Sequence, residues 1–393
     1  MDKREDVKHI PYAAQWIEDD DIQAVEEVLK SDYLTTGPKI NEFEQAFAAY
    51  VGAKYAVAVS SGTAALHAAC FAAGIKKDDE VITTPMTFAA SANCVFYCGG
   101  RPVFADIDPN TYNIDSSAIE NCITSKTKAI IPVHFTGQPC DMGAIIAIAK
   151  KYNLIVIEDA AHALGAEYKG QKIGAISDMT CFSFHPVKHI TTGEGGMITT
   201  NDECLYKKLI QFRNHGITRD RSLLRHDDGP WYYEQQFLGY NYRMTDIQAA
   251  LGMSQLKKIN RFLARRRKIV NRYNEVFSDI PQIVIPHQMS EAQSAWHLYI
   301  LQLKLEQLAA SRKEIYLSLQ QRGIGVNVHY IPVYYHPYYK KLGYNRGLCP
   351  NAETLYDRII TIPLYPKMSD DDVEYVIEAI KESLIIGGKY EGI

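Results

Sequence analysis

Leu154-Ile155-Val156-Ile157 is a short, β-branched apolar run, and the acid Asp159 closes it. Runs of this kind, bounded by polar residues, are typical of strands that are buried on both faces. Similar runs recur on both sides of it, with helical patterns between them. Apolar strands that alternate with helices indicate a largely parallel sheet with helices on both faces. The sequence therefore predicts an α/β fold.

The alternation extends through just over the first half of the chain, after an extended arm at 10–12. The expected strands cover residues 55–59, 80–84, 102–107, 129–135, 154–157, 179–184 and 197–200. The expected helices cover residues 20–31, 43–50, 63–73, 88–97, 116–123, 142–152 and 203–214. The polar and aromatic segment 219–236 interrupts the pattern, and we expect it to be a mobile excursion.

A long helical pattern at 245–277 carries the chain into a smaller α/β piece. Here we expect strands at 297–303 and 325–330 and a helix at 311–322. A last helix should begin at Ser369, whose hydroxyl is a good N-cap before three acids. We therefore predict a large domain at 1–255 and a small domain at 256–393.

Composition excludes several classes of protein. The chain has 393 residues, 47% of them hydrophobic and 22% charged, as in soluble globular proteins. Its net charge of −4 and the lack of a long basic run argue against a nucleic-acid partner. No apolar run approaches the ~20 residues that span a bilayer, and the charged start shows no signal peptide. Eight scattered cysteines without a C-x-x-C pair indicate reduced thiols in a cytoplasmic protein and no metal site.

One lysine and one acid suggest the chemistry. Lys188 lies in a Gly- and Thr-rich turn directly after the apolar run 179–184, and Asp159 ends the run before it. Pyridoxal phosphate requires such a pair: an amine for the Schiff base and an acid that keeps the ring nitrogen protonated. A lone lysine in a glycine turn would ordinarily lie at the surface, and Asp159 would serve equally well as a helix cap. The two together favour a pyridoxal-phosphate site.

Further signals lie at the expected ends of other strands. Ser61, Gly62 and Thr63 stand where a strand turns into a helix, which suits a phosphate but also an ordinary N-cap. Ser183 ends a strand and could point a hydroxyl at the same phosphate. Phe88 could lie flat on a pyridine ring or be a core residue. His162 could touch the phenolic oxygen of the cofactor or be a satisfied buried histidine. Jointly, weak signals at one face of one sheet make a strong prediction.

With these motifs in order, the sequence resembles the DegT/DnrJ/EryC1/StrS family of sugar-nucleotide aminotransferases, which have the type I fold of pyridoxal-phosphate enzymes. The resemblance covers nearly the whole chain. It implies that Lys188 forms the Schiff base, Asp159 pairs with the ring nitrogen and Phe88 stacks on the ring. The segment 238–246 matches a family stretch whose Asn241 would reach the cofactor phosphate of a second copy. The resemblance thus implies a homodimer with shared active sites.

Within the family, several stretches are most similar to UDP-4-amino-4,6-dideoxy-N-acetyl-β-L-altrosamine transaminases of the pseudaminic-acid pathway. These stretches are residues 34–37, 161–168, 184–188 and 328–334. Many relatives carry Gln where His162 stands. The candidate contacts to sugar or nucleotide are Tyr12, Tyr33, Leu34, Thr35, Arg243, His329 and Tyr330.

The reaction that this resemblance implies moves the amino group of L-glutamate to C4 of a UDP-linked 4-keto-6-deoxy-N-acetylhexosamine. The alternatives are a transaminase for another nucleotide-linked 4-keto sugar, of the perosamine or bacillosamine type, and a sugar dehydratase. Relatives of the dehydratase type replace the lysine with histidine, so Lys188 argues against that activity, although His189 lies next to it. A non-catalytic regulator would usually bring a DNA-binding segment, and the first 50 residues or so show none.

Overall fold

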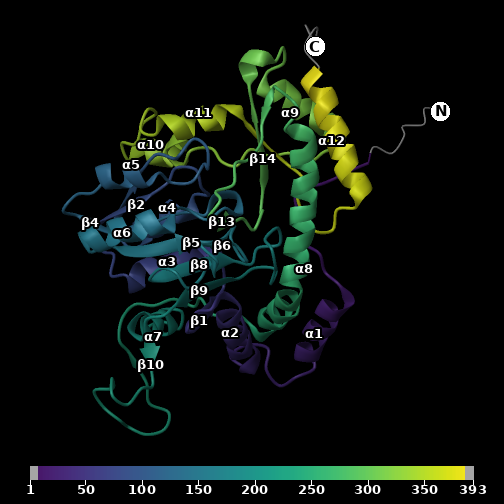
Figure 1. Ribbon diagram of the computed structural model, residues 1–393. Helices are drawn as coiled ribbons and strands as arrows, with labels where there is room; N and C mark the ends of the chain where they lie inside the picture. Colours follow the sequence, from purple (N-terminus) through teal and green to yellow (C-terminus); the bar gives the residue numbers. More distant parts are fainter. Residues whose placement is uncertain (1–7, 386–393) are drawn as a thin grey trace.

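A seven-stranded sheet forms the centre of the larger part of the computed structural model, which describes residues 8–385 (Figure 1). Its strands, in spatial order, are β1 (Tyr55–Val59), β9 (Gly196–Thr200), β8 (Met179–Ser183), β5 (Ile155–Asp159), β4 (Thr127–Ile131), β2 (Glu80–Thr83) and β3 (Arg101–Phe104). Only β9 runs antiparallel to its neighbours. The other six strands therefore bring their carboxyl ends to one edge of the sheet, which confirms the predicted α/β fold with a largely parallel sheet.

Side chains alternate between two hydrophobic clusters along each strand, so both faces of the sheet are covered. On β5, Val156 packs into the cluster with α2 and α6, whereas Ile157 packs into the cluster with α3 and α7. The helices around the sheet are α2 (Pro38–Val51), α3 (Gly62–Ala72), α4 (Ala90–Tyr97), α5 (Ser116–Asn121), α6 (Met142–Tyr152) and α7 (Glu203–Phe212). Burial on both faces is the reason that these strands are uniformly apolar in sequence.

The helix α8 (Asp246–Phe277) leads from the large sheet to the C-terminal part, and α1 (Asp19–Leu29) packs beside it (Figure 1). Thr245 and Gln248 form a capping box at its start, which fixes where the helix begins. The predicted boundary at residue 255 falls inside this helix, and the division into two domains stays a prediction.

The C-terminal part is built on an antiparallel sheet in the order β12 (Ile283–Val284), β14 (Tyr299–Leu303) and β15 (Ile359–Ile362). Its helices are α9 (Arg312–Gln321), α10 (Pro337–Lys341), α11 (Pro350–Arg358) and α12 (Asp370–Ile385). The Oγ atom of Ser369 accepts a hydrogen bond from the backbone N–H of Asp372, so the predicted cap of the last helix is confirmed.

The predicted strand at 325–330 is wrong. Asn327 makes a single backbone bridge to Thr361 of β15, and residues 328–331 then line a cavity instead of continuing a ladder. The third strand of this sheet is β15, which the sequence pattern did not predict. The strand-like pattern at 325–330 is thus explained by contacts with the core, where Val326 packs, and with the cavity, which Val328 and Tyr330 line.

Short strand pairs complete the description. β13 (Ala292–Gln293) pairs with β6 (Glu167–Tyr168), which pairs with β7 (Gln171–Lys172), and β10 (Ile217–Thr218) pairs with β11 (Glu234–Gln235). This last pair closes the excursion 219–236, which extends beyond α7 in Figure 1; its mobility stays a prediction. Three short 3-10 turns lie at Phe135–Gly137, Leu305–Gln307 and Val333–Tyr335.

Two further observations apply only to residues 8–385. No helix there is long and apolar enough to cross a membrane, and no three side chains among His, Cys, Asp and Glu gather as a metal ion would require. We predict the lack of a signal peptide from the charged stretch at the start of the sequence. The first seven residues of this stretch lie outside the described part.

A buried hydrogen-bond network anchors the middle of the large sheet. The Nε2–H of His134 donates to Glu158 over 2.8 Å, since its Nδ1 accepts from the backbone N–H of Cys140. The hydroxyls of Ser177 and Thr180 donate to the other oxygen of the Glu158 carboxylate. Burial would raise the pKa of Glu158, but these hydrogen bonds outweigh burial and hold the pKa below its usual value.

We expect the substitution Glu158→Gln to destabilise the protein by about 2 kcal/mol, because an amide has one acceptor oxygen where the buried carboxylate offers two to its three donors. Thermal unfolding should show a midpoint several degrees lower at neutral pH. The folded-state pKa of Glu158 lies below the unfolded one, so its contribution exists above the unfolded pKa and is lost as the pH falls. The difference between wild type and variant should therefore shrink in acid. Equal midpoints at neutral pH would contradict this role.

Candidate active site

A cavity of about 610 Å³ opens at the edge where the parallel strands end. The turns after β1, β2, β5 and β8 line one side of it, and residues 327–331 with the N-terminal arm line the other. Eleven of the predicted site residues line this one cavity: Tyr12, Ser61, Gly62, Thr63, Phe88, Asp159, His162, Ser183, Lys188, His329 and Tyr330. The carboxyl edge of a parallel sheet is the usual place for a ligand in such folds.

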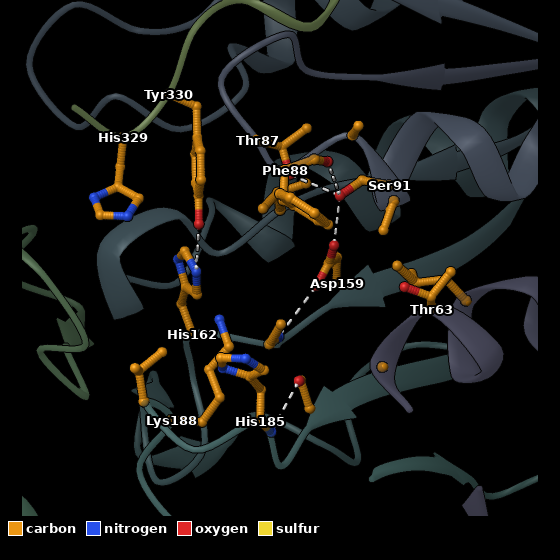
Figure 2. Close-up of a pocket in the computed structure, with 18 of the residues that line it drawn as sticks. Thr63, Thr87, Phe88, Ser91, Asp159, His162, His185, Lys188, His329 and Tyr330 are labelled. Carbon is orange, nitrogen blue, oxygen red and sulfur yellow. Dashed lines mark hydrogen bonds between the residues drawn. The ribbon is translucent and has the colours of Figure 1, made fainter. Parts of the chain in front are cut away.

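Lys188 reaches the cavity from the turn after β8, where its backbone N–H donates to the carbonyl of His185. Its Nζ atom lies 3.5 Å from Nε2 of His297 (Figure 2 shows the amine and Asp159 facing the same space). Burial lowers the pKa of the Lys188 amine to about 8, because an ammonium group loses hydration there. The Asp159 carboxylate opposes this shift and the Arg266 guanidinium adds to it. The amine is therefore much easier to deprotonate than a surface lysine.

The surroundings of Lys188 are unusually rich in buried nitrogen. Burial and neighbouring cations hold the pKa values of His162, His189 and His297 well below their usual range, so these rings stay neutral. Arg266 is also buried and donates to the backbone carbonyls of Trp296, His297 and Leu364. Within residues 8–385, Arg266 has no carboxylate partner. Its uncompensated charge disfavours a proton on Lys188.

Asp159 ends β5 and is 5% exposed. Its Oδ2 atom accepts a hydrogen bond of 2.6 Å from the Ser91 hydroxyl, and its Oδ1 atom accepts one of 3.1 Å from the backbone N–H of Ala161. The bond to Ala161 spans two residues in a turn, so Asp159 does not cap a helix. A carboxylate has acceptor sites for more than two partners, and this one borders the cavity.

The first turn of α3 faces the cavity where β1 ends. Ser61 is the N-cap, and its Oγ atom accepts from the backbone N–H of Ala64, so the capping interpretation of this serine is correct. Gly62 allows a close approach to Ser183, because a Cβ at this position would lie 2.8 Å from the Ser183 Cβ atom. Free backbone N–H groups and the positive end of the helix dipole favour an anion such as a phosphate here.

Aromatic and imidazole rings cover the space between these groups. Phe88 is 64% exposed and lines the cavity, so it is not a core residue. Its ring lies 6.4 Å from that of Tyr330, whose hydroxyl is 3.3 Å from Nε2 of His162. Tyr12 and His329 lie side by side at 5.5 Å. A flat, apolar surface beside a carboxylate and an amine suits an aromatic cofactor.

Five predicted site residues do not line this cavity: Tyr33, Leu34, Thr35, Asn241 and Arg243. They lie on two neighbouring stretches, since Thr35 bridges to Thr245 and Arg243 donates to Asn214, whose backbone bridges to Asn241. Tyr33 and Leu34 are 56% and 48% exposed. Their roles stay predictions.

The sequence reasoning missed two residues that touch the central pair. Ser91 bonds to Asp159, and no local pattern marks this contact, because it joins the first turn of α4 to the end of β5. His297 contacts Lys188 from a segment 109 residues away, and no local pattern marks that contact. The lining residues His185, Glu194, Asn327 and His336 were also not predicted.

The arrangement fits pyridoxal phosphate. A buried primary amine of lowered pKa and a carboxylate border one cavity, together with the N-terminus of α3 and an exposed aromatic ring. These are the four kinds of group that the aldehyde, the ring nitrogen, the phosphate and the ring face of that cofactor require.

Comparison with known proteins agrees with this geometry. Residues 15–381 match the model of the DegT/DnrJ/EryC1/StrS aminotransferase family. The spore coat polysaccharide biosynthesis protein SpsC of Bacillus subtilis is 48% identical over 375 residues, covering 95% of this chain and 96% of its own.

Two solved structures are similar over almost their whole length. The sugar aminotransferase Spr1654 of Streptococcus pneumoniae, described as putative and solved in PMP and PLP forms, is 35% identical. The PMP form matches this structure with a TM-score of 0.89, and the match covers 95% of this chain and 99% of that one. Helicobacter pylori PseC, an aminotransferase of pseudaminic acid biosynthesis, is 33% identical with a TM-score of 0.89, covering 96% and 99%. This chain belongs to the DegT/DnrJ/EryC1/StrS aminotransferase family and is a sugar aminotransferase that depends on pyridoxal phosphate.

Proposed function

We propose that this enzyme transfers the amino group of L-glutamate to C4 of a UDP-linked 4-keto-6-deoxy-N-acetylhexosamine, a step towards pseudaminic acid in a surface or flagellar glycan. The observation that carries the chemistry is the placement of Lys188 and Asp159 in one cavity. The likeness to PseC supports the choice of sugar.

Lys188 is the proposed catalytic residue. When bound, pyridoxal phosphate supplies an aldehyde that takes up amino groups and a ring that withdraws electrons from them. Lys188 would hold the cofactor through its aldehyde carbon, and its freed amine would accept the proton that leaves the Cα of the amino donor. That step needs a neutral amine, and burial together with Arg266 favours the neutral form.

Other lining residues hold the cofactor in this proposal. Asp159 holds the ring nitrogen, Phe88 covers the ring, and His162 faces the phenolic oxygen. The first turn of α3, with Ser183 close to Gly62, binds the phosphate. Neutral His162 can donate or accept a hydrogen bond without adding charge beside Lys188.

Tyr12, His329 and Tyr330 are the proposed sugar contacts, because they line the cavity opposite the cofactor groups. The second stretch of predicted residues, around Tyr33, Leu34, Thr35 and Arg243, suits a homodimer in which each chain completes the site of the other. Asn241 would then contact the cofactor phosphate of the partner. Its location outside the lining of the cavity in its own chain supports this assignment.

A second candidate substrate is another nucleotide-linked 4-keto sugar. SpsC, which is named for spore coat polysaccharide, has a higher identity to this chain than PseC has. Enzymes of both kinds would use the same amine and carboxylate, so only the sugar contacts distinguish them.

The substrate is tested with a panel of UDP-, dTDP- and GDP-linked 4-keto sugars. The purified enzyme with L-glutamate should aminate the UDP-linked 4-keto-6-deoxy-N-acetylhexosamine most efficiently, and NMR of the product shows the position and orientation of the new amine. Preference for a dTDP- or GDP-linked sugar would exclude the proposed substrate. Failure to aminate any sugar of the panel would argue against the proposed donor and acceptor pair.

The substitution Lys188→Ala should abolish turnover and remove the visible absorbance band of lysine-bound pyridoxal phosphate, because no other amine lines the cavity within the described residues. Lys207→Ala is the control, since this lysine is 65% exposed on α7 and pairs with Glu203. It should retain both properties. Transamination by the Lys188 variant would refute the assignment.

The lowered pKa of Lys188 makes a separate prediction for the cofactor-free enzyme. Only a neutral amine attacks the aldehyde, so the rate of cofactor attachment should rise with pH and level off above about 8. One pH unit below that pKa, roughly a tenth of the amine is neutral. Stopped-flow absorbance after mixing with pyridoxal phosphate measures this rate. A midpoint near that of a surface lysine would show that the amine is not buried as described.

A further inference from the structure

Three oxygen atoms form a continuous buried chain that ends at Asp159. The Oγ1 atom of Thr87 lies 2.6 Å from the Oγ atom of Ser91, which lies 2.6 Å from Oδ2 of Asp159 (Figure 2). Ser91 is fully buried and Thr87 is 3% exposed. Distances of this size are typical of strong O–H···O hydrogen bonds, above all when the acceptor is charged.

The direction of each hydrogen bond follows from the donors present. The ionised carboxylate of Asp159 can only accept, so the single hydroxyl hydrogen of Ser91 points to it. That hydrogen is therefore not shared with the carbonyl of Phe88, which lies farther away at 3.3 Å. The Ser91 oxygen then accepts from the Thr87 hydroxyl. Both hydroxyl hydrogens have one orientation each, and both are directed towards Asp159.

These two hydrogen bonds also connect parts of the site that follow different strands. Thr87 lies on the turn that leads from β2 into α4 and Ser91 lies in the first turn of α4, with Phe88 between them, whereas Asp159 ends β5. The side chain of Phe88 is 64% exposed, and its ring lies 6.4 Å from that of Tyr330. The hydrogen bonds on either side of it tie this turn to the carboxylate.

We propose that Ser91 is a positioning residue of this enzyme: supported by Thr87, its hydroxyl orients the Asp159 carboxylate for the ring nitrogen of pyridoxal phosphate and fixes the turn that carries Phe88. This inference rests on the proposed role of Asp159. Ser91 does not act as a helix cap, because its hydroxyl hydrogen is donated to the Asp159 side chain on β5 and not to the backbone of α4.

The test compares how cofactor-free wild type and Ser91→Ala bind two probes. One is pyridoxal phosphate, and the other is its 1-deaza analogue, in which carbon replaces the ring nitrogen. Both carry the aldehyde and the phosphate, so the ratio of their dissociation constants isolates the hold on the ring nitrogen. Absorbance titration of the cofactor-free enzyme measures this ratio without any turnover.

Wild type should bind pyridoxal phosphate far more tightly than the analogue, and in Ser91→Ala this preference should fall about tenfold, the size expected for one hydrogen bond to a charged group. Binding of the analogue itself should change little. If both proteins showed the same preference, Ser91 would have only a structural role and the inference would be overturned. If wild type did not discriminate at all, the role of Asp159 would fail as well, which separates the two failures.

Thr87 and Thr199 supply the matched variants. Thr87→Val keeps the size and removes the outer hydroxyl, so it should lower the preference less than Ser91→Ala does, while Thr87→Ser should restore it. Thr199 is equally buried, and its hydroxyl donates to the carbonyl of Gly174 over 2.6 Å, away from the cavity. Thr199→Val should lose thermal stability without any change in the preference for the ring nitrogen. A change equal to that of Ser91→Ala would show that the effect is merely structural.

Discussion

The site depends on the shared direction of six strands in the large sheet. Because β1, β8 and β5 all end at one edge, Ser61, Ser183 and Asp159 converge there although roughly a hundred residues separate the first from the others. The reversed strand β9 makes this convergence work, since it lies between β1 and β8 and keeps both in the same direction. The network around Glu158 then fixes β5 next to β4 and β8, directly beside the carboxylate that faces the cavity.

The pKa of the Lys188 amine depends on Asp159 as well as on burial. Burial and Arg266 make the Lys188 amine easy to deprotonate, whereas Asp159 opposes this shift. Hydrogen bonds from Ser91 and Ala161 hold the carboxylate in one orientation. The result is a cavity in which one group is an easily deprotonated amine and the other an acid held in place, and this is what a transamination on pyridoxal phosphate needs.

Much of this could be predicted from the sequence, because strand ends carry local signals. The runs around Asp159 and Lys188 placed both residues at the same edge, and the structure brings both to one cavity. Contacts between distant segments leave no such signal. His297 meets Lys188 across 109 residues. The pattern at 325–330 resembles a strand because Val326 packs in the core while Val328 and Tyr330 line the cavity. The stretches around Tyr33 and Asn241 lie outside this cavity, and their roles stay predictions.

Arg266, on the long helix α8, influences the pKa of Lys188. Its guanidinium is anchored by peptide oxygens from two separate stretches of the C-terminal part, at Trp296 and His297 and at Leu364. The field that this cation exerts on Lys188 therefore originates in the connecting helix and not in the strands that form the cofactor site. The pKa of the reactive amine is thus lowered in part by a cation that backbone carbonyls of the C-terminal part hold in place.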